Sequence, residues 1–198
     1  MGMTADLLET YLAAQRVFGE RVHAITEEQW QGDTPCDKWT VAELVGHLVE
    51  ENLWAAPLLH GLDLDAAEKV VKGARSLPVD GGVGANRAQE WDEASVAAAD
   101  AFSADGALDR DVALSRGSTP ARDYLMEMIF DLVVHGWDLG KAIGYPEPIP
   151  AELADVLYPE AKKFGDLSST GMFHAPVEVP ADASSLDKLV ALTGRDPR

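Results

Sequence analysis

Apolar residues recur along this chain at the three- and four-residue spacing of amphipathic helices. The pattern predicts four long helices: residues 4–25, a second from Val41 to Pro57 or just before it, about 87–103, and 119–143. Shorter helices are expected within residues 60–85, at about 151–163, and after Ser184 or Ser185. A set of long helices with short connections predicts an all-α helical bundle.

The helix near residues 119–143 is the most apolar of the four. Thr119 is expected to cap it, Pro120 suits its first position, and Gly144 followed by Pro146 predicts its end after about 24 residues. Its apolar side chains cover most of the circumference, so the helix is expected inside the bundle.

Start signals also precede two other helices. Thr40 and Glu43 have the spacing of a capping box, and Asn86 with Gln89 resembles a second one. Pro78, Gly81 and Gly82 predict a flexible connection before the third long helix.

The remaining segments read as loops. Residues 26–39 contain Trp30 and Trp39, which we expect to fold over one end of the bundle. Residues 104–118 are a predicted loop with a short strand or extended piece at Asp111–Ser115, and residues 164–183 are expected to be extended. Pro159 is a possible kink or break in the helix at 151–163.

One narrow polar stripe interrupts the apolar surface of the 119–143 helix. Its members follow one another at spacings of four, four and three, and they therefore share a face: Glu127, Asp131, His135 and Asp138. A carboxylate and an imidazole one turn apart can bind the same ion, as in helix-borne zinc sites. The alternative is that the stripe is the solvated face of an ordinary helix.

The other candidate residues carry weaker signals. His47 lies on the flank of the second helix, where a hydrogen-bonded boundary residue is the alternative to a ligand. His23 is expected on the surface and His60 in a loop. For Cys36 a packed thiol is favoured over a nucleophile, because only Lys38 is near enough in sequence to lower the pKa of its thiol.

Composition narrows the class of partner. The 198 residues include 34 Asp and Glu against 16 Lys and Arg, a formal net charge of −18 that disfavours nucleic acid and anionic membranes. A single cysteine excludes an internal disulfide and, with no signal-peptide pattern and no long apolar run, favours a cytoplasmic protein.

Three stretches together carry a resemblance to a known family. They are Thr34-Pro-Cys-Asp-Lys-Trp-Thr-Val41 through Gly46-His-Leu48, Asp131-Leu-Val-Val-His-Gly-Trp-Asp-Leu139, and the closing Leu189-Val-Ala-Leu-Thr-Gly-Arg-Asp-Pro197. The chain resembles actinobacterial metal-binding proteins related to the metal-binding domain of mycothiol-dependent maleylpyruvate isomerase, which belong with the DinB-like four-helix bundles.

The resemblance implies the fold and the ligands. It implies a DinB-like four-helix bundle with extra short helices, formed by residues 1–163, with a C-terminal extension at 164–198 packed on the same domain. It also implies a divalent metal ion bound by His47, Asp131 and His135, where the isomerase has Glu in place of Asp131. Zinc is the first expectation, and nickel or iron(II) suits the same two-histidine, one-carboxylate set.

Two hypotheses about function follow. The first is a metal- and thiol-dependent transferase or isomerase that acts on a small molecule with a low-molecular-weight thiol. Candidates for orienting the metal ligands or accepting protons are Glu127, Glu51 and Asp138. Exposure to solvent is the simpler expectation for each of these three side chains. Because the isomerase has a further carboxy-terminal domain after the bundle, its own substrate is not carried over. The second hypothesis is a noncatalytic bundle that forms a homodimer or binds a protein partner.

Overall fold

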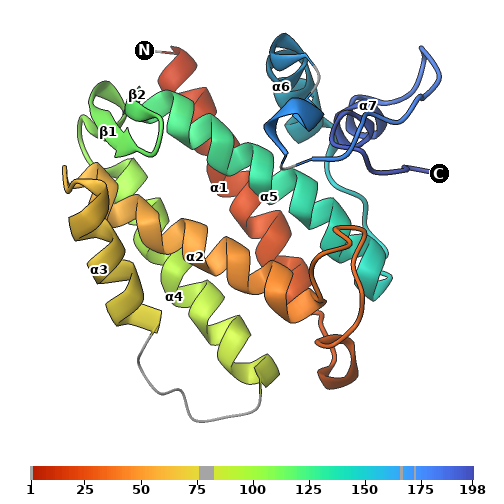
Figure 1. Ribbon diagram of the computed structural model, residues 1–198, viewed down its shortest axis with the longest axis horizontal. Coiled ribbons are helices and arrows are strands. Elements are labelled where there is room, and N and C mark those ends of the chain that lie inside the picture. The colour runs from red at the N-terminus through yellow and green to blue at the C-terminus, as the bar shows by residue number, and fades with distance from the viewer. Residues whose placement is uncertain (1, 76–82, 166, 172) are drawn as a thin grey trace.

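The computed structural model describes residues 2–75, 83–165, 167–171 and 173–198. Four long helices cross the molecule side by side, and shorter elements cover their ends (Figure 1). The helices are α1 (Gly2–Val22), α2 (Val41–Leu59), α3 (Leu64–Arg75), α4 (Val83–Ser103), α5 (Ala121–Ile143), α6 (Ala151–Ala161) and α7 (Ser185–Leu192). Short 3-10 turns lie at Glu27–Gln29, Ala107–Asp109, Lys162–Phe164 and Leu167–Thr170. The predicted all-α bundle is confirmed.

The four long helices form a closed ring around one core. Helix α2 packs most extensively on α4, and α1 on α5, while the α2–α5 and α1–α4 contacts complete the ring. The largest fully buried side chains come from all four helices: Tyr11, Phe18, Leu44, Leu48, Leu58, Leu59, Phe102, Leu125, Met128, Ile129, Leu132 and Leu139. The α2–α5 and α1–α4 edges therefore lie on opposite sides of the bundle. Among the described residues, no helix combines the length and the apolar character that a membrane crossing requires.

The start of α2 is as predicted, and its end is not. The Thr40 hydroxyl accepts a hydrogen bond from the Glu43 amide, and the Thr40 amide donates to the Glu43 carboxylate at 2.8 Å. The helix continues through Pro57 to Leu59, so a helix end at Pro57 was wrong. A proline in the last turn removes only one backbone hydrogen bond, and burial of Leu58 and Leu59 offsets that loss.

Thr119 does not cap α5. It lies in strand β2 (Gly117–Pro120), which pairs antiparallel with β1 (Asp111–Leu114) so that Thr119 faces Val112. The Thr119 hydroxyl donates to the Gly117 carbonyl rather than accepting a hydrogen bond from the first-turn amides of the helix. The stretch at 111–115, expected as a short strand or an extended piece, contains a strand at Asp111–Leu114 that is half of a hairpin. Pro120 occupies the N-cap position without a side-chain hydrogen bond, so its expected place in the first turn was wrong. At the other end, Gly144 ends the helix at φ +67° as predicted.

Other boundaries differ from the sequence pattern by a few residues. Helix α1 ends at Val22, three residues early, and α4 begins at Val83, so Asn86 lies inside the helix and the predicted cap there was wrong. Helix α6 contains Pro159 without a break and ends at Ala161, where a 3-10 turn follows. The predicted connection at Pro78, Gly81 and Gly82 lies outside the described residues.

The C-terminal segment after residue 163 contacts the rest of the chain through helix α7. Helix α7 packs on α6 and contacts α5, and the Val177 amide donates to the Ala191 carbonyl. Ser184 caps α7 by accepting a hydrogen bond from the Asp187 amide, as predicted. In Figure 1 the chain after α7 runs to the C-terminus on the same side of the molecule as α6. This arrangement brings Arg195 against Asp138 in the C-terminal half of α5.

Candidate metal centre

The structure brings His47, Asp131 and His135 together at the α2–α5 edge. His47 comes from α2, and the other two lie one turn apart on α5. One potential ligand atom of each lies within 4.8 Å of those of the other two. The His47 Nε2 and Asp131 Oδ2 atoms are 3.6 Å apart, and the two imidazole rings are edge to face with centroids separated by 5.4 Å.

This donor set fits a divalent cation. Two nitrogens and a carboxylate oxygen suit zinc, nickel or iron(II). Ligand atoms about 2 Å from one ion lie at most about 4 Å from each other. Because the candidate ligand atoms here lie within 4.8 Å of one another, side-chain movements of only about 1 Å would allow all three to bind one ion. Three protein ligands leave at least one coordination position for water or a small molecule.

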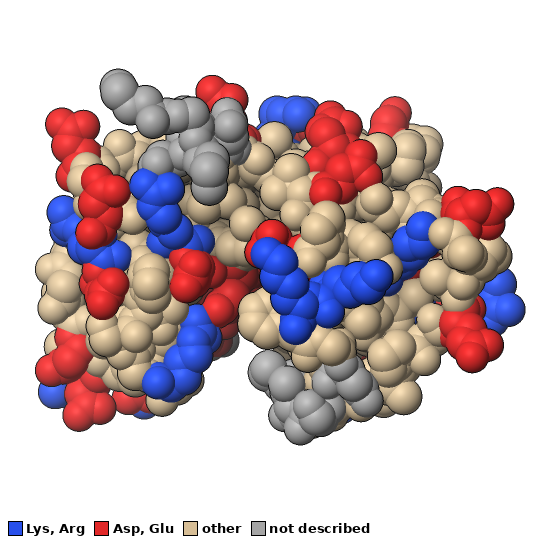
Figure 2. Space-filling view, turned by 90° about the horizontal axis from the view of Figure 1, so that it is seen from above, with Lys and Arg blue, Asp and Glu red and all other residues tan. Residues whose placement is uncertain are grey.

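The site is half enclosed. His135 is buried at 6% exposure, while the His47 and Asp131 side chains are 26% and 30% exposed. Trp39 covers the two imidazoles, with ring centroids 4.6 Å from His47 and 5.3 Å from His135. The predicted aromatic loop therefore lies over the site. Figure 2 shows a hollow between two halves of the face seen from above, with acidic side chains in its depth.

Opposite charges within the site shift the pKa values of His47 and Asp131 so that the charged form of each is favoured. Burial alone would lower the pKa of His47, but the Asp131 carboxylate raises it above its usual value. Burial alone would raise the pKa of Asp131, but contact with His47 and the charges of His135 and Arg195 lower it. Asp131 is therefore an anion at neutral pH, the form a metal ion requires.

Glu51 and Glu127 differ in their surroundings. The Glu51 Oε1 atom is 4.0 Å from His47 Nδ1, and burial, followed by repulsion from Asp131, raises the pKa of Glu51 to about 7. Its side chain is half-buried at 34% exposure, not free on the surface. Glu127 is exposed, as expected from the sequence, and it pairs with Arg116.

The expectation that Asp138 is exposed was wrong. Its side chain has no exposed area, and its Oδ2 atom lies 2.9 Å from His135 Nδ1. Arg195 donates to both of its oxygens, from Nε at 3.0 Å and from Nη2 at 2.7 Å. The carboxylate is buried because these partners replace its hydration.

Stability should fall on acidification because of Asp138. Burial alone would raise its pKa, but the interactions with His135 and Arg195 hold the pKa below its usual value. The charged form therefore adds stability above the unfolded-state pKa of about 3.9, and this stability disappears as pH falls through the lower folded-state pKa. Urea unfolding of the wild type and of Asp138→Asn between pH 7 and pH 3 should show a steeper loss for the wild type. Parallel curves would contradict this assignment.

Cys36, His135 and Asp138 form a second group with potential ligand atoms within 4.8 Å of one another. Both Asp138 oxygens already accept hydrogen bonds from Arg195, and one also contacts His135, so this group has no free carboxylate for an ion. Cys36 is half-buried, and burial raises the pKa of its thiol. The geometry supports the expectation of a packed thiol.

The remaining histidines are not members of the group of three proposed ligands. His23 pairs with Asp92 and is 54% exposed, and His174 contacts Asp37 at 68% exposure. His60 is exposed, and its backbone amide closes α2. The surface position expected for His23 is confirmed.

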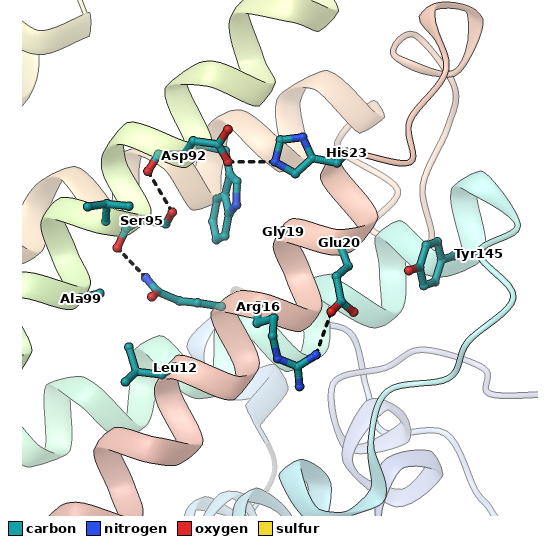
Figure 3. A pocket seen from close by; sticks show the side chains of 12 residues that line it. Leu12, Arg16, Gly19, Glu20, His23, Asp92, Ser95, Ala99 and Tyr145 are labelled. Atoms are coloured by element: carbon teal, nitrogen blue, oxygen red, sulfur yellow. Dashed lines mark hydrogen bonds and ion pairs between the residues drawn. The ribbon is translucent and has the colours of Figure 1, made fainter.

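A groove of about 630 Å³ lies on the opposite α1–α4 edge of the bundle. In Figure 3, Arg16 and Glu20 pair along α1, while His23 reaches across to Asp92 of α4. Leu12 lines the groove at 40% exposure and Val96 at 61%. This groove is not lined by any of the three proposed metal ligands, so its volume does not indicate where a reaction would take place.

Arg195 is the residue that sequence reasoning missed. It lies 57 residues from Asp138, beyond any helical spacing rule. A signal was present, because Arg195 lies in the closing Thr-Gly-Arg-Asp-Pro stretch that supported the family resemblance. Nothing in that stretch indicated which carboxylate the arginine would meet.

Comparisons with known proteins agree with the fold. The family model described as Mycothiol maleylpyruvate isomerase N-terminal domain matches residues 11–140. Uncharacterized proteins from two strains of Mycobacterium tuberculosis are each 27% identical over 98% of this chain and 100% of their own length. The crystal structure of the mycothiol-dependent maleylpyruvate isomerase is similar with a TM-score of 0.60 and 15% identity, over 80% of this chain and 69% of that one. A structure of a histidine-to-alanine mutant of that enzyme gives a TM-score of 0.64 at 11% identity, over 87% of this chain and 73% of that one.

Proposed function

Because this chain belongs to the family of the mycothiol maleylpyruvate isomerase N-terminal domain, we propose that it binds one divalent metal ion through His47, Asp131 and His135. The observation that carries the proposal is the convergence of these side chains, from two helices, within 4.8 Å. Zinc is the ion proposed first, with nickel or iron(II) as alternatives for the same donors.

We further propose a transferase or isomerase that uses a low-molecular-weight thiol and a small-molecule substrate. A bound divalent ion would lower the pKa of a coordinated water or thiol and so supply a nucleophile near neutral pH. Glu51, half-buried beside His47 and with a pKa of about 7, is suited to hold or accept a proton there. Support for the thiol comes from the mycothiol dependence in the names of the family and of the solved isomerase.

We include in the proposal the domain boundaries and the cellular location that the sequence predicts. Residues 1–163 would form the metal-binding domain, with residues 164–198 as an extension packed on it. A cytoplasmic location agrees with the single cysteine.

Metal analysis tests the central claim. Protein purified without a histidine tag should contain close to one equivalent of zinc, nickel or iron by mass spectrometry. It should lose that metal to excess chelator and regain it on reloading with zinc or nickel. Absence of stoichiometric metal both before stripping and after reloading would reject the metal site.

The second candidate is a noncatalytic bundle that forms a homodimer. The exposed Leu12 and Val96 beside the α1–α4 groove favour it, since clustered apolar side chains often mark interfaces. In that case His135→Ala would change thermal stability equally with and without added metal. Light scattering should then also give the mass of a dimer, which Val96→Glu reduces to that of a monomer.

A further inference from the structure

Three buried polar side chains connect the C-terminal segment to the proposed metal centre. Arg195 donates two hydrogen bonds to Asp138, and Asp138 Oδ2 lies 2.9 Å from His135 Nδ1. The side chains are 8%, 0% and 7% exposed, respectively. Water therefore has little access to the connection between residue 195 and the histidine.

The contact with Asp138 determines which His135 nitrogen carries the proton. An ionised carboxylate can only accept hydrogen bonds, so a neutral His135 paired with it is protonated at Nδ1. Its Nε2 atom then has a free lone pair. Since a metal ion needs such a lone pair, this tautomer is the one competent to bind at the His47–Asp131 side.

Arg195 is itself held in place by the backbone around it. Its Nη1 atom donates to the Thr193 carbonyl at 3.2 Å, and its amide donates to the Val190 carbonyl at 3.1 Å. Gly194 has φ +83°, and a Cβ atom there would lie only 2.5 Å from the His174 Cβ atom. Only glycine suits this position, which fixes the backbone of the turn. The hydrogen bonds to Thr193 and Asp138 then hold the guanidinium in place.

From these contacts we propose that Arg195 is a positioning residue of the metal centre: it holds Asp138, which keeps His135 protonated at Nδ1 and presents Nε2 to the ion. The C-terminal segment is then part of the metal site, although no residue of it binds the metal. This inference rests on the proposed function for the ion. Its statement about the His135 tautomer holds for metal-free protein as well.

A buried ion pair with a purely structural role is the alternative. Such a pair would affect stability without changing the His135 tautomer or the metal affinity of protein that stays folded. Tautomer and affinity are therefore the measurements that separate the two roles.

The test compares Arg195→Met and Arg195→Lys with the control Arg198→Met. Arg198 lies three residues further on, is 75% exposed, and pairs with Asp196. Long-range nitrogen–proton NMR of histidine-labelled, metal-free protein should show the Nδ1-protonated form for wild type and control. Arg195→Met removes the donors that hold Asp138 against His135, so the carboxylate can turn away from the ring. This variant should therefore show a mixture of tautomers and bind zinc about 10–100-fold more weakly, the usual effect of losing an outer partner of a metal ligand. Arg195→Lys, which keeps the charge without the two-pronged donor, should lie between them.

Asp138→Asn keeps the proposal testable if the methionine variant does not fold. With its oxygen accepting from Arg195, the amide nitrogen would face His135 Nδ1 and donate to it, which selects the Nε2-protonated form. This variant should therefore lose more than about 10-fold in zinc affinity while retaining its helical circular dichroism. An Nε2-protonated His135 in the wild type, or folded variants with unchanged tautomer and affinity, would overturn the inference. A wild type that binds no zinc but shows the Nδ1 form would reject the proposed function and leave the Arg195–Asp138–His135 positioning intact.

Discussion

Replacing His135 by alanine should reduce zinc affinity by at least about 100-fold. Four-ligand structural zinc sites provide roughly 10–16 kcal/mol, so one protein ligand contributes about 3 kcal/mol, or about two powers of ten in Kd. His135 is the most enclosed of the three proposed ligands, which leaves little room for water to replace its ring. Competition with a chromophoric chelator measures the change directly.

Thermal unfolding provides a second measurement of the same loss. Zinc at 100 times its Kd should stabilise the wild type by about 2.7 kcal/mol, which for a chain of this size raises Tm by about 5–11 °C. His135→Ala should show no such rise. His23→Ala, which removes an exposed histidine paired with Asp92, should respond to zinc like the wild type. An equal zinc response in all three proteins would contradict the assigned ligands.

Breaking the buried ion pair should destabilise the protein strongly. Arg195→Met leaves the fully buried Asp138 carboxylate without its cation, and loss of one partner of a buried pair typically costs about 3–5 kcal/mol. For a chain of 150–250 residues this lowers Tm by about 6–20 °C. Urea unfolding of metal-free protein at pH 7 measures the loss without a contribution from bound metal.

Removing both charges together should cost less than either single change. In Arg195→Met with Asp138→Leu, apolar contacts replace the pair, and such replacements are often neutral or stabilising. Recovery of at least about 2 kcal/mol relative to Arg195→Met would show that the uncompensated charge causes the loss. Additive losses would instead mean that the two residues act independently. Because the double variant has no Asp138 carboxylate, its zinc affinity should stay low even where stability recovers.

The candidate ligands were predictable to different degrees. Asp131 and His135 share a face because they are four residues apart on one helix, which is a local property of the chain. His47 could not be added from spacing, because its position against α5 depends on how two helices pack. Only the family resemblance supplied it, and the fold then placed its ring 5.4 Å from that of His135.

The errors at helix boundaries have a similar cause. The sequence predicted that α5 begins at Thr119 and Pro120, but Thr119 instead pairs with β1 in a hairpin. Pro57 read as a stop, yet burial of the two leucines after it extended α2. In the first case pairing within a hairpin, and in the second burial in the core, outweighed a local preference of about 1–3 kcal/mol.

By itself the sequence determined the helical class, the capping box of α2, the Gly144 end of α5 and the polar stripe, because periodicity and capping act within a few residues. The tertiary structure alone decided that Asp138 is buried, that Arg195 is its partner, and that a tryptophan covers the two imidazoles. These are long-range contacts, and a charged residue on a helix face looks the same in sequence whether water or a buried guanidinium will surround it. Only the packing of the C-terminal segment against α5 distinguishes the two.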